Sequence, residues 1–211
     1  MTTQPAAPRP RKQRSDGERT RAAILDAAMR LASVEGIEGL TLGRLAAELG
    51  VSKSGLYAHF GSKEQLQLET IDAALEVFGR EVIAPAHEVR EGLPRLEAMV
   101  AAYFSYLERW VFPGGCFFGS LLAEMDARPG SVHEKVLDVE RAWLAEFREY
   151  VAGAQRLGEL DADADVEQLV FELYACMELA NYHFVLFRDP AVLERGRRAV
   201  DRILDHAAFR S

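Results

Sequence analysis

The residues with the clearest chemical potential lie between positions 52 and 60. A helix through this stretch would hold the donors of Lys53, Ser54, Tyr57 and His59 on one polar side. Ammonium, hydroxyl and imidazole donors suit phosphate oxygens and base edges. An acid–base role for Tyr57 and His59 would also need a nucleophile or an orienting carboxylate, and the neighbouring sequence offers only Glu64. The residue types therefore favour binding over catalysis.

Two short helices are needed to position these donors. Thr41 can cap a first helix and Ser52 a second, because their side-chain oxygens accept from amides of the first helical turn. Gly50 supplies the backbone freedom for a tight turn, and Val51 is expected to pack into the angle between the helices. Two crossed helices of which the second exposes donors have the geometry that enters a major groove of DNA.

The stretch from Leu40 to Leu66 resembles the DNA-binding domain of TetR-family transcriptional regulators. In that family a Thr opens the first helix of the motif, and a pattern close to V-S-x-x-x-L-Y-x-H-F-x-S-K-E-x-L follows. This sequence matches at Thr41, Val51, Ser52, Leu56, Tyr57, His59, Phe60, Ser62, Lys63, Glu64 and Leu66. It departs at Ala58, where relatives often carry a bulky side chain. The predicted DNA contacts are Thr41, Ser52, Lys53, Ser54, Gly55, Tyr57, His59 and Lys63.

Composition indicates an all-α globular protein. The 211 residues are 49% hydrophobic and 27% charged, helix formers dominate, and alternating β-branched runs are nearly absent. No apolar run approaches the length of a membrane span and the N-terminus is polar, so we expect a cytoplasmic protein without a membrane partner. Cys116 and Cys176 make neither a disulfide framework nor a metal set, and no cofactor is expected.

Charge is divided unevenly along the chain. Residues 1–65 hold 10 Lys or Arg against 7 Asp or Glu, whereas residues 66–211 hold 15 against 26, within a net charge of −8. A basic head on an acidic body is the asymmetry expected of a protein that touches phosphate at one end only. Arg9, Arg11, Lys12 and Arg14 would form a basic arm on DNA or a solvated tail.

About nine helices in two domains are predicted. Residues 1–14 are read as a disordered arm, 15–62 as a three-helix helix-turn-helix domain, and 63–211 as a helical domain for effector binding and dimerisation. Besides the two motif helices, we expect helices at about 16–34, 62–83, 94–111, 116–127, 131–156, 166–187 and 190–208. Capping boxes are expected at Ser62 with Gln65, Ser131 with Glu134, and Asp165 with Gln168.

The resemblance implies an effector cavity among the helices of the body. Aromatic, Met and Leu side chains there exceed what one small core needs, although core packing explains any single one of them. The candidate lining is Met99, Tyr103, Leu107, Phe117, Leu121, Trp143, Phe147, Tyr174, Met177 and His183. With Tyr103, Tyr174 and His183 as its polar points, such a lining would suit a small and largely apolar effector.

The resemblance also implies a homodimer in which the last two helices of each chain form a four-helix bundle. Those helices carry apolar residues over a wide arc, which needs burial on more than one side. The candidate interface is Leu173, Ala180, Phe184, Val200, Ile203 and Leu204. The function expected is that of a regulator, most simply a repressor, that leaves its double-stranded DNA operator when the effector binds.

Two other functions stay open at the level of sequence. Cys116 follows two glycines at a helix start, where a thiol pKa can be lowered, so a redox-sensing regulator is one alternative. A small helical enzyme is the other, although it would need convergent polar residues in the body. The run Asp161, Asp163 and Asp165 has the spacing of a calcium loop, but Val166 stands where such a loop needs Gly.

Overall fold

The computed structural model describes residues 11–125 and 129–208, and every regular element in these ranges is helical. In chain order the elements are α1 (Arg11–Glu35), α2 (Leu42–Leu49), α3 (Lys53–Phe60), α4 (Lys63–Phe78), η1 (Gly79–Ile83), α5 (Ala84–His87), α6 (Leu93–Glu108), α7 (Phe117–Met125), α8 (Ser131–Arg156), α9 (Val166–Phe187) and α10 (Ala191–Ala207). Because α4, η1 and α5 run on without a break, the described ranges contain nine separate helices, as predicted.

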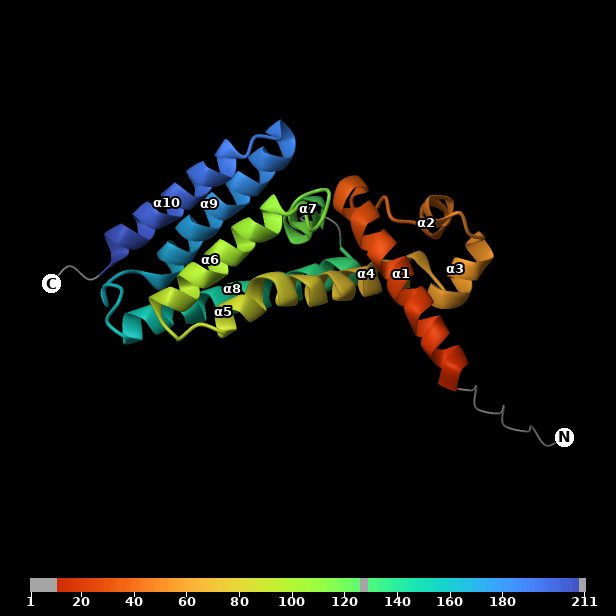
Figure 1. Ribbon diagram of the computed structural model, residues 1–211, viewed down its shortest axis with the longest axis horizontal. Helices are drawn as coiled ribbons and strands as arrows, with labels where there is room; N and C mark the ends of the chain where they lie inside the picture. Colours follow the sequence, from red (N-terminus) through yellow and green to blue (C-terminus); the bar gives the residue numbers. More distant parts are fainter. Residues whose placement is uncertain (1–10, 126–128, 209–211) are drawn as a thin grey trace.

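Helices α1, α2 and α3 form a small head at one end of an elongated molecule (Figure 1). Its core is closed by apolar residues that are almost fully buried: Ile24, Ala28, Ile37, Leu40, Leu45, Leu56, Phe60 and Leu66. Gly50, at φ 65°, ends α2 in the left-handed conformation and turns the chain into α3. Val51 differs from its prediction, because its side chain remains 50% exposed and does not fill the angle between the helices.

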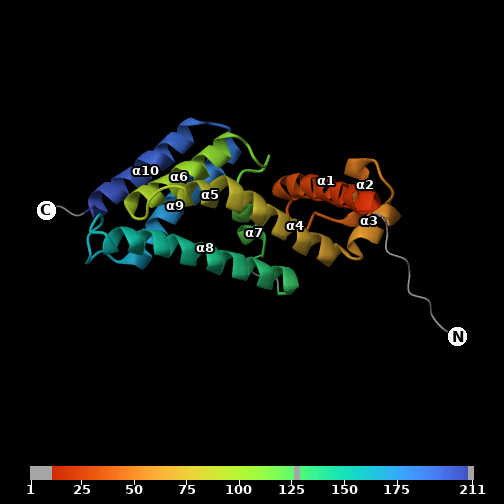
Figure 2. The ribbon, with the colours of Figure 1, turned by 60° about the horizontal axis from the view of Figure 1, so that its bottom comes forward.

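A continuous rod formed by α4, η1 and α5 links the head to the body (Figure 2). The rod continues past Ile83, where the sequence predicted the helix to end, and it includes Pro85. A π-helical turn precedes the proline, and the amide of Ala84 bonds to the carbonyl of Gly79, five residues back. Widening the helix in this way removes the clash that a proline ring makes with the preceding turn.

The body consists of α6, α8, α9 and α10 together with the rod, and the short α7 lies between this bundle and the head (Figures 1 and 2). Phe78 joins the rod to the bundle, with its ring edge-on to Tyr106 at 5.9 Å and to Trp143 at 5.2 Å. Edge-on aromatic pairs add to the stabilisation from buried area. The rod is thus packed into the body at one end and into the head at the other.

Helix ends differ from the predictions where local signals compete. Helix α1 begins at Arg11, so Arg11, Lys12 and Arg14 belong to a helix and not to a disordered arm. Good helix formers follow Pro10, and no later proline interrupts them. The predicted arm otherwise falls on residues 1–10, outside the described residues. Helix α6 ends at Glu108, before the predicted Val111, because Trp110 takes a left-handed conformation with φ 49°.

The caps show which local signals were sufficient. The side chains of Ser62 and Asp165 accept from the first-turn amides of α4 and α9, as expected. The side chains of Gln65 and Gln168 bond to Glu69 and Glu172 instead of closing the predicted boxes. At α8, however, Gly130 is the cap residue, and the hydroxyl of Ser131 donates to Glu64 of the rod. The predicted capping box of Ser131 with Glu134 is therefore wrong, because the Ser131 hydroxyl bonds to Glu64 and not to an amide of α8.

Across the described ranges, no helix combines the length and the apolar character that crossing a membrane requires.

Candidate functional site

Helix α3 presents a polar outer face to solvent. Lys53, Ser54 and Gly55 are exposed at its N-terminal end, and the Tyr57 side chain is 59% exposed one turn later. Leu56 and Phe60 point inward and are almost fully buried. The helix therefore holds its donors away from the core, on a surface that a groove could receive.

Local hydrogen bonds fix where these donors lie. The Ser52 side chain accepts from the Gly55 amide at 3.1 Å, and Ser54 donates to the Ser52 oxygen at 3.2 Å. Thr41 accepts from the Arg44 amide at 3.1 Å, which leaves its own hydroxyl proton free for another acceptor. Caps of this kind also leave amides at a helix N-terminus facing outward, where phosphate binds readily.

Arg21 of α1 fastens the far end of α3, a role that the sequence did not reveal. Its Nη1 donates to the carbonyl of His59 at 2.7 Å, its guanidinium lies 4.7 Å from the centre of the Phe60 ring, and it pairs with Glu69 of α4. One side chain therefore ties three helices together. No spacing rule links position 21 with position 59, because the contact exists only in the folded head.

Lys63 differs from the other predicted DNA contacts. Its Nζ lies 2.8 Å from Glu38 Oε2, in an ion pair that joins α4 to the loop after α1. His59 is half-buried, and its ring lies beside Phe60. The exposed set is thus Ser52, Lys53, Ser54, Gly55 and Tyr57, whereas Thr41, His59 and Lys63 lie partly buried at its margins.

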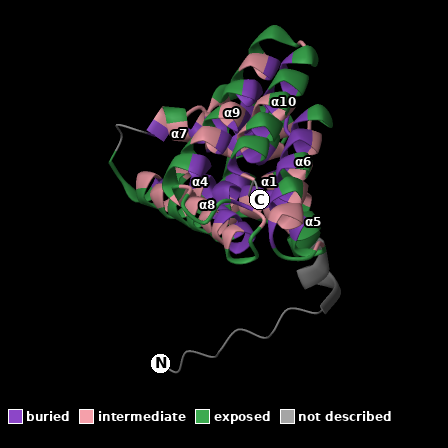
Figure 3. Cartoon of the chain, turned by 90° about the vertical axis from the view of Figure 1, so that its left-hand side faces the viewer, coloured by how far each residue is buried: buried purple, intermediate pink, exposed green. Residues whose placement is uncertain are grey.

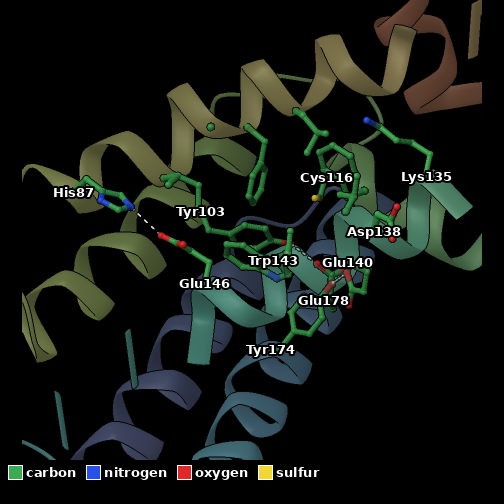
Figure 4. Close-up of a pocket in the computed structure, with 17 residues that line it drawn as sticks. His87, Tyr103, Cys116, Lys135, Asp138, Glu140, Trp143, Glu146, Tyr174 and Glu178 are labelled. Atoms are coloured by element: carbon green, nitrogen blue, oxygen red, sulfur yellow. Dashed lines mark hydrogen bonds and ion pairs between the residues drawn. The ribbon is translucent and has the colours of Figure 1, made fainter. Parts of the chain in front are cut away.

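The body contains a cavity of about 530 Å³ beneath the rod (Figure 4). Its walls come from the rod, α6, the start of α7, α8 and α9. The lining residues are Leu75, Phe78, Gly79, Ile83, His87, Tyr103, Cys116, Phe118, Lys135, Asp138, Val139, Glu140, Ala142, Trp143, Glu146, Tyr174 and Glu178. A cavity of this size is in the range that small-molecule sites occupy.

Three of the ten predicted pocket residues line this cavity: Tyr103, Trp143 and Tyr174. The others lie elsewhere because their helices turn them into the core between neighbouring helices or away from the cavity. Met99, Leu107, Phe117, Leu121, Phe147 and Met177 are buried core residues, and His183 packs against Phe187 at a ring distance of 5.2 Å.

The carboxylates of the cavity were missed, although the sequence held a signal for one of them. Glu178 is the only Asp, Glu, Lys or Arg between Leu173 and Phe187, an otherwise apolar and uncharged helical run. A lone charge in such a run points to a buried polar role. Glu140 carries no such signal, because it lies in a charged stretch of α8.

Burial determines the protonation of the cavity. It raises the pKa of the Glu178 carboxyl to about 7, against a hydrogen bond from Tyr103 that lowers it, and the nearby charge of Glu140 adds to the increase. Burial likewise raises the pKa of Glu140. The pKa of Cys116 rises to about 12, first through burial and then through the charge of Glu178. The helix start therefore does not activate this thiol.

Contacts between α7 and the loop after α1 join the cavity region to the head. The Glu124 carboxylate accepts from the amides of Ile37 at 2.7 Å and Glu38 at 2.8 Å. Gly114 lies so close to α1 that a Cβ there would be 1.7 Å from the carbonyl oxygen of Ser33. The segment that carries Cys116 and Phe118 into the cavity therefore also holds the head.

Comparison with known proteins agrees with both halves of this architecture. The family model "Tetracyclin repressor-like, C-terminal domain" matches residues 92–200, and "Bacterial regulatory proteins, tetR family" matches residues 24–70. The first match alone covers more than half of the chain. These matches identify the helix-turn-helix head and the hollow helical body as those of a transcriptional regulator. This chain belongs to the TetR family.

Individual relatives support the assignment. The chain is 30% identical to the transcriptional regulator LmrA of Bacillus subtilis over 135 residues, which cover 62% of this chain and 70% of LmrA. It is 36% identical to the regulator BetI of Agrobacterium fabrum over 84 residues, 40% of this chain, and so spans only 41% of the length of BetI. A TetR regulator structure from Chloroflexus aurantiacus superposes with a TM-score of 0.80 at 26% identity, over 91% of this chain and 96% of that one.

Proposed function

We propose that the chain binds double-stranded operator DNA through α3 and represses transcription until a small effector enters the body. The observation that carries this proposal is the outer face of α3, where Lys53, Ser54, Gly55 and Tyr57 are exposed together at a capped helix start. Major-groove readout needs a short helix with exposed donors at its N-terminal part. The basic head and the acidic body favour contact with DNA through this end alone.

The test is retardation of the chain's own promoter DNA by Lys53→Ala and Tyr57→Ala proteins. We expect each to weaken binding by roughly tenfold or more, since a good base or phosphate contact is worth about 1–3 kcal/mol. Arg141→Ala is the matched control, because it removes one exposed positive charge from α8, away from the head. Operator binding that is unchanged in both head variants would overturn the assignment of α3.

A homodimer is part of the proposal, but it uses a different face from the one the sequence suggested. Leu173, Ala180, Phe184, Val200 and Leu204 are buried inside the chain, and Ile203 is partly buried. They lie on the sides of α9 and α10 that pack on each other and on the body, so a partner cannot reach them.

Buried and exposed positions alternate along α9 (Figure 3). An exposed apolar stripe on this helix is the better candidate for the interface. Its members recur at helical spacing along one face: Phe171, Ala175, Leu179, Tyr182 and Leu186. Phe171 is 69% exposed and Leu186 is 71% exposed. A continuous apolar stripe on a surface helix indicates a protein interface. Two chains joined here would place two copies of α3 on a two-fold symmetric operator.

Sedimentation of a Leu179→Glu protein tests this interface. Leu179 is 55% exposed, so a charge there should leave the monomer folded and remove the dimer. Leu157→Glu is the control, because Leu157 has the same 55% exposure at the end of α8. A Leu179→Glu protein that sediments as a dimer would exclude the stripe.

Effector control would act through the two connections between cavity and head. The rod lines the cavity with Leu75, Phe78, Gly79, Ile83 and His87, and its first turns pack against α1. The start of α7 lines the cavity, while its Glu124 holds the loop that follows α1. A ligand that shifts either element would change the orientation of α3, which couples the two sites. Because Cys116 is buried and its thiol pKa is raised to about 12, thiol redox sensing is not favoured.

A further inference from the structure

Most charged groups around the cavity already have a partner. Nε2 of His87 lies 2.8 Å from Glu146 Oε1, and Tyr150 donates to the same oxygen at 2.6 Å. Lys135 pairs at 2.5 Å with Asp72 of the rod. The ammonium of Lys135 and the ring of His87 therefore already have carboxylate partners within the protein.

Two carboxylates of the cavity have no cationic partner among the described residues. Glu140 receives one hydrogen bond, a long one of 3.3 Å from Tyr174. Glu178 receives a hydrogen bond of 2.7 Å from Tyr103 on its Oε1. Its Oε2 is buried without a hydrogen bond of good geometry, although the amide of Asn181 lies alongside. Carboxylates that are largely removed from water in this way are costly unless a positive charge compensates them.

Aromatic rings surround the two carboxylates. The ring of Trp143 lies 6.3 Å from that of Tyr174 and 5.2 Å from that of Phe78, centre to centre. In Figure 4 Glu140, Glu178 and Tyr174 are gathered beside Trp143. Indole and phenol faces attract cations, and Trp is the strongest of them. Carboxylates and ring faces thus favour the same kind of ligand.

We propose that the effector is an organic cation, with its ammonium group beside Glu140 and Glu178 and its apolar part against Trp143 and Phe78. This proposal deepens the proposed function, because it assigns a ligand class to the cavity taken there as the effector site. An anion is disfavoured because the unpaired groups are acidic. A neutral ligand would leave the charge of Glu140 uncompensated. The experiment must therefore distinguish a cationic ligand from a neutral one.

A pair of probes that share a shape but differ in charge provides the test. Phenyltrimethylammonium and tert-butylbenzene differ at one central atom, which is a positively charged nitrogen in the first and a carbon in the second. Calorimetric titration of the full chain, without DNA, should show the cation binding roughly tenfold or more tightly than the neutral probe. Equal affinity for the two probes would overturn the proposal without any substitution.

Two substitutions place the charge requirement on the named residues. Glu178→Gln and Glu140→Gln keep the side-chain shape, and each should weaken the cation by roughly tenfold while leaving tert-butylbenzene within about twofold. Glu97→Gln is the matched control, since it removes one negative charge from the exposed side of α6. Cation binding that is unchanged in both cavity variants would contradict the proposal, because the attraction would then be that of the acidic body as a whole.

Failure of this inference can be told apart from failure of the proposed function. The titrations contain no DNA, and operator retardation by the unliganded protein does not involve the cavity. A protein that binds its operator but has equal affinity for the charged and the neutral probe would remain a regulator with a neutral effector. A protein that binds the cation but not DNA would keep the ligand class and lose the proposed regulatory role.

Discussion

Polar groups lie in opposite surroundings in the head and in the body. In the head, Lys53, Ser54 and Tyr57 stand in water on one short helix, held by caps within a few residues. In the body, Glu140 and Glu178 come from two helices and lie in a cavity walled by aromatic rings. An exposed donor is solvated by water, so it destabilises the protein little when no phosphate is bound. A carboxylate removed from water destabilises the protein unless a cation is bound beside it. The head suits an extended polyanion, and the body suits a small ligand.

The joint between the two regions is where the largest effect on stability is expected. Gly114→Ala would place a methyl group 1.7 Å from the carbonyl oxygen of Ser33, so α1 must move away from the body. We expect a loss of about 3 kcal/mol in the free energy of unfolding, measured by urea titration. Gly17→Ala is the control, because nothing lies within 4 Å of its added Cβ. If both proteins unfold alike, the head and the body are not packed as described.

The cavity of the body should contribute a pH dependence to the stability of the protein. The pKa of Glu178 is raised from 4.5 to about 7, mainly by burial, so the folded state binds more protons than the unfolded state between these values. The contribution of Glu178 to stability is therefore greatest below about pH 4.5 and is lost as the pH rises through 7. The groups facing Glu178 from other elements are Tyr103, Tyr106, Cys116 and Glu140, and the pKa of Glu140 is raised as well.

Glu178→Gln removes this titration. At pH 8 we expect the variant to be more stable than the parent by about 1–2 kcal/mol, with no gain at pH 4.5. Thermal unfolding at the two pH values measures the difference. A parent protein whose stability rises from pH 5 to pH 7 relative to that of Glu178→Gln would show that Glu178 is not a desolvated group.

Glu124 should contribute a smaller amount, and only to the joint. Glu124→Ala removes two charge-assisted hydrogen bonds to the amides of Ile37 and Glu38. A loss of about 1–2 kcal/mol is expected, with faster hydrogen exchange of these two amides. Glu97→Ala, on an exposed position of α6, should leave their exchange unchanged.

The smallest effect on stability is expected from two serine substitutions. One serine caps a helix, and the other bonds to a residue of a distant helix. Ser52→Ala removes the acceptor of the Gly55 amide and should cost about 1 kcal/mol. Ser131→Ala removes no cap and should cost less than about 0.5 kcal/mol. Chemical denaturation of the two proteins measures both losses in the free energy of unfolding. Equal losses would mean that the Ser52 cap does not stabilise the head.

Much of the head could be predicted because its determinants are close together in the chain. Thr41, Gly50 and Ser52 act within three or four residues of themselves, and all three take the conformations their residue types favour. The caps at Ser62 and Asp165 and the bounds of α9 followed from the same short-range rules. Errors arose where a distant group intervened, as when Glu64 captured Ser131.

The sequence by itself determined the helices, the family and the outward face of α3, because periodicity and capping are properties of neighbouring residues. Only the tertiary structure decided which residues enclose the cavity and which side of α9 stays exposed. Those outcomes depend on how whole helices rotate against one another, and a helix with apolar residues over a wide arc has several ways to pack. For this reason Met177 became core, Glu178 became cavity wall and Leu179 became surface, although they are consecutive in the chain.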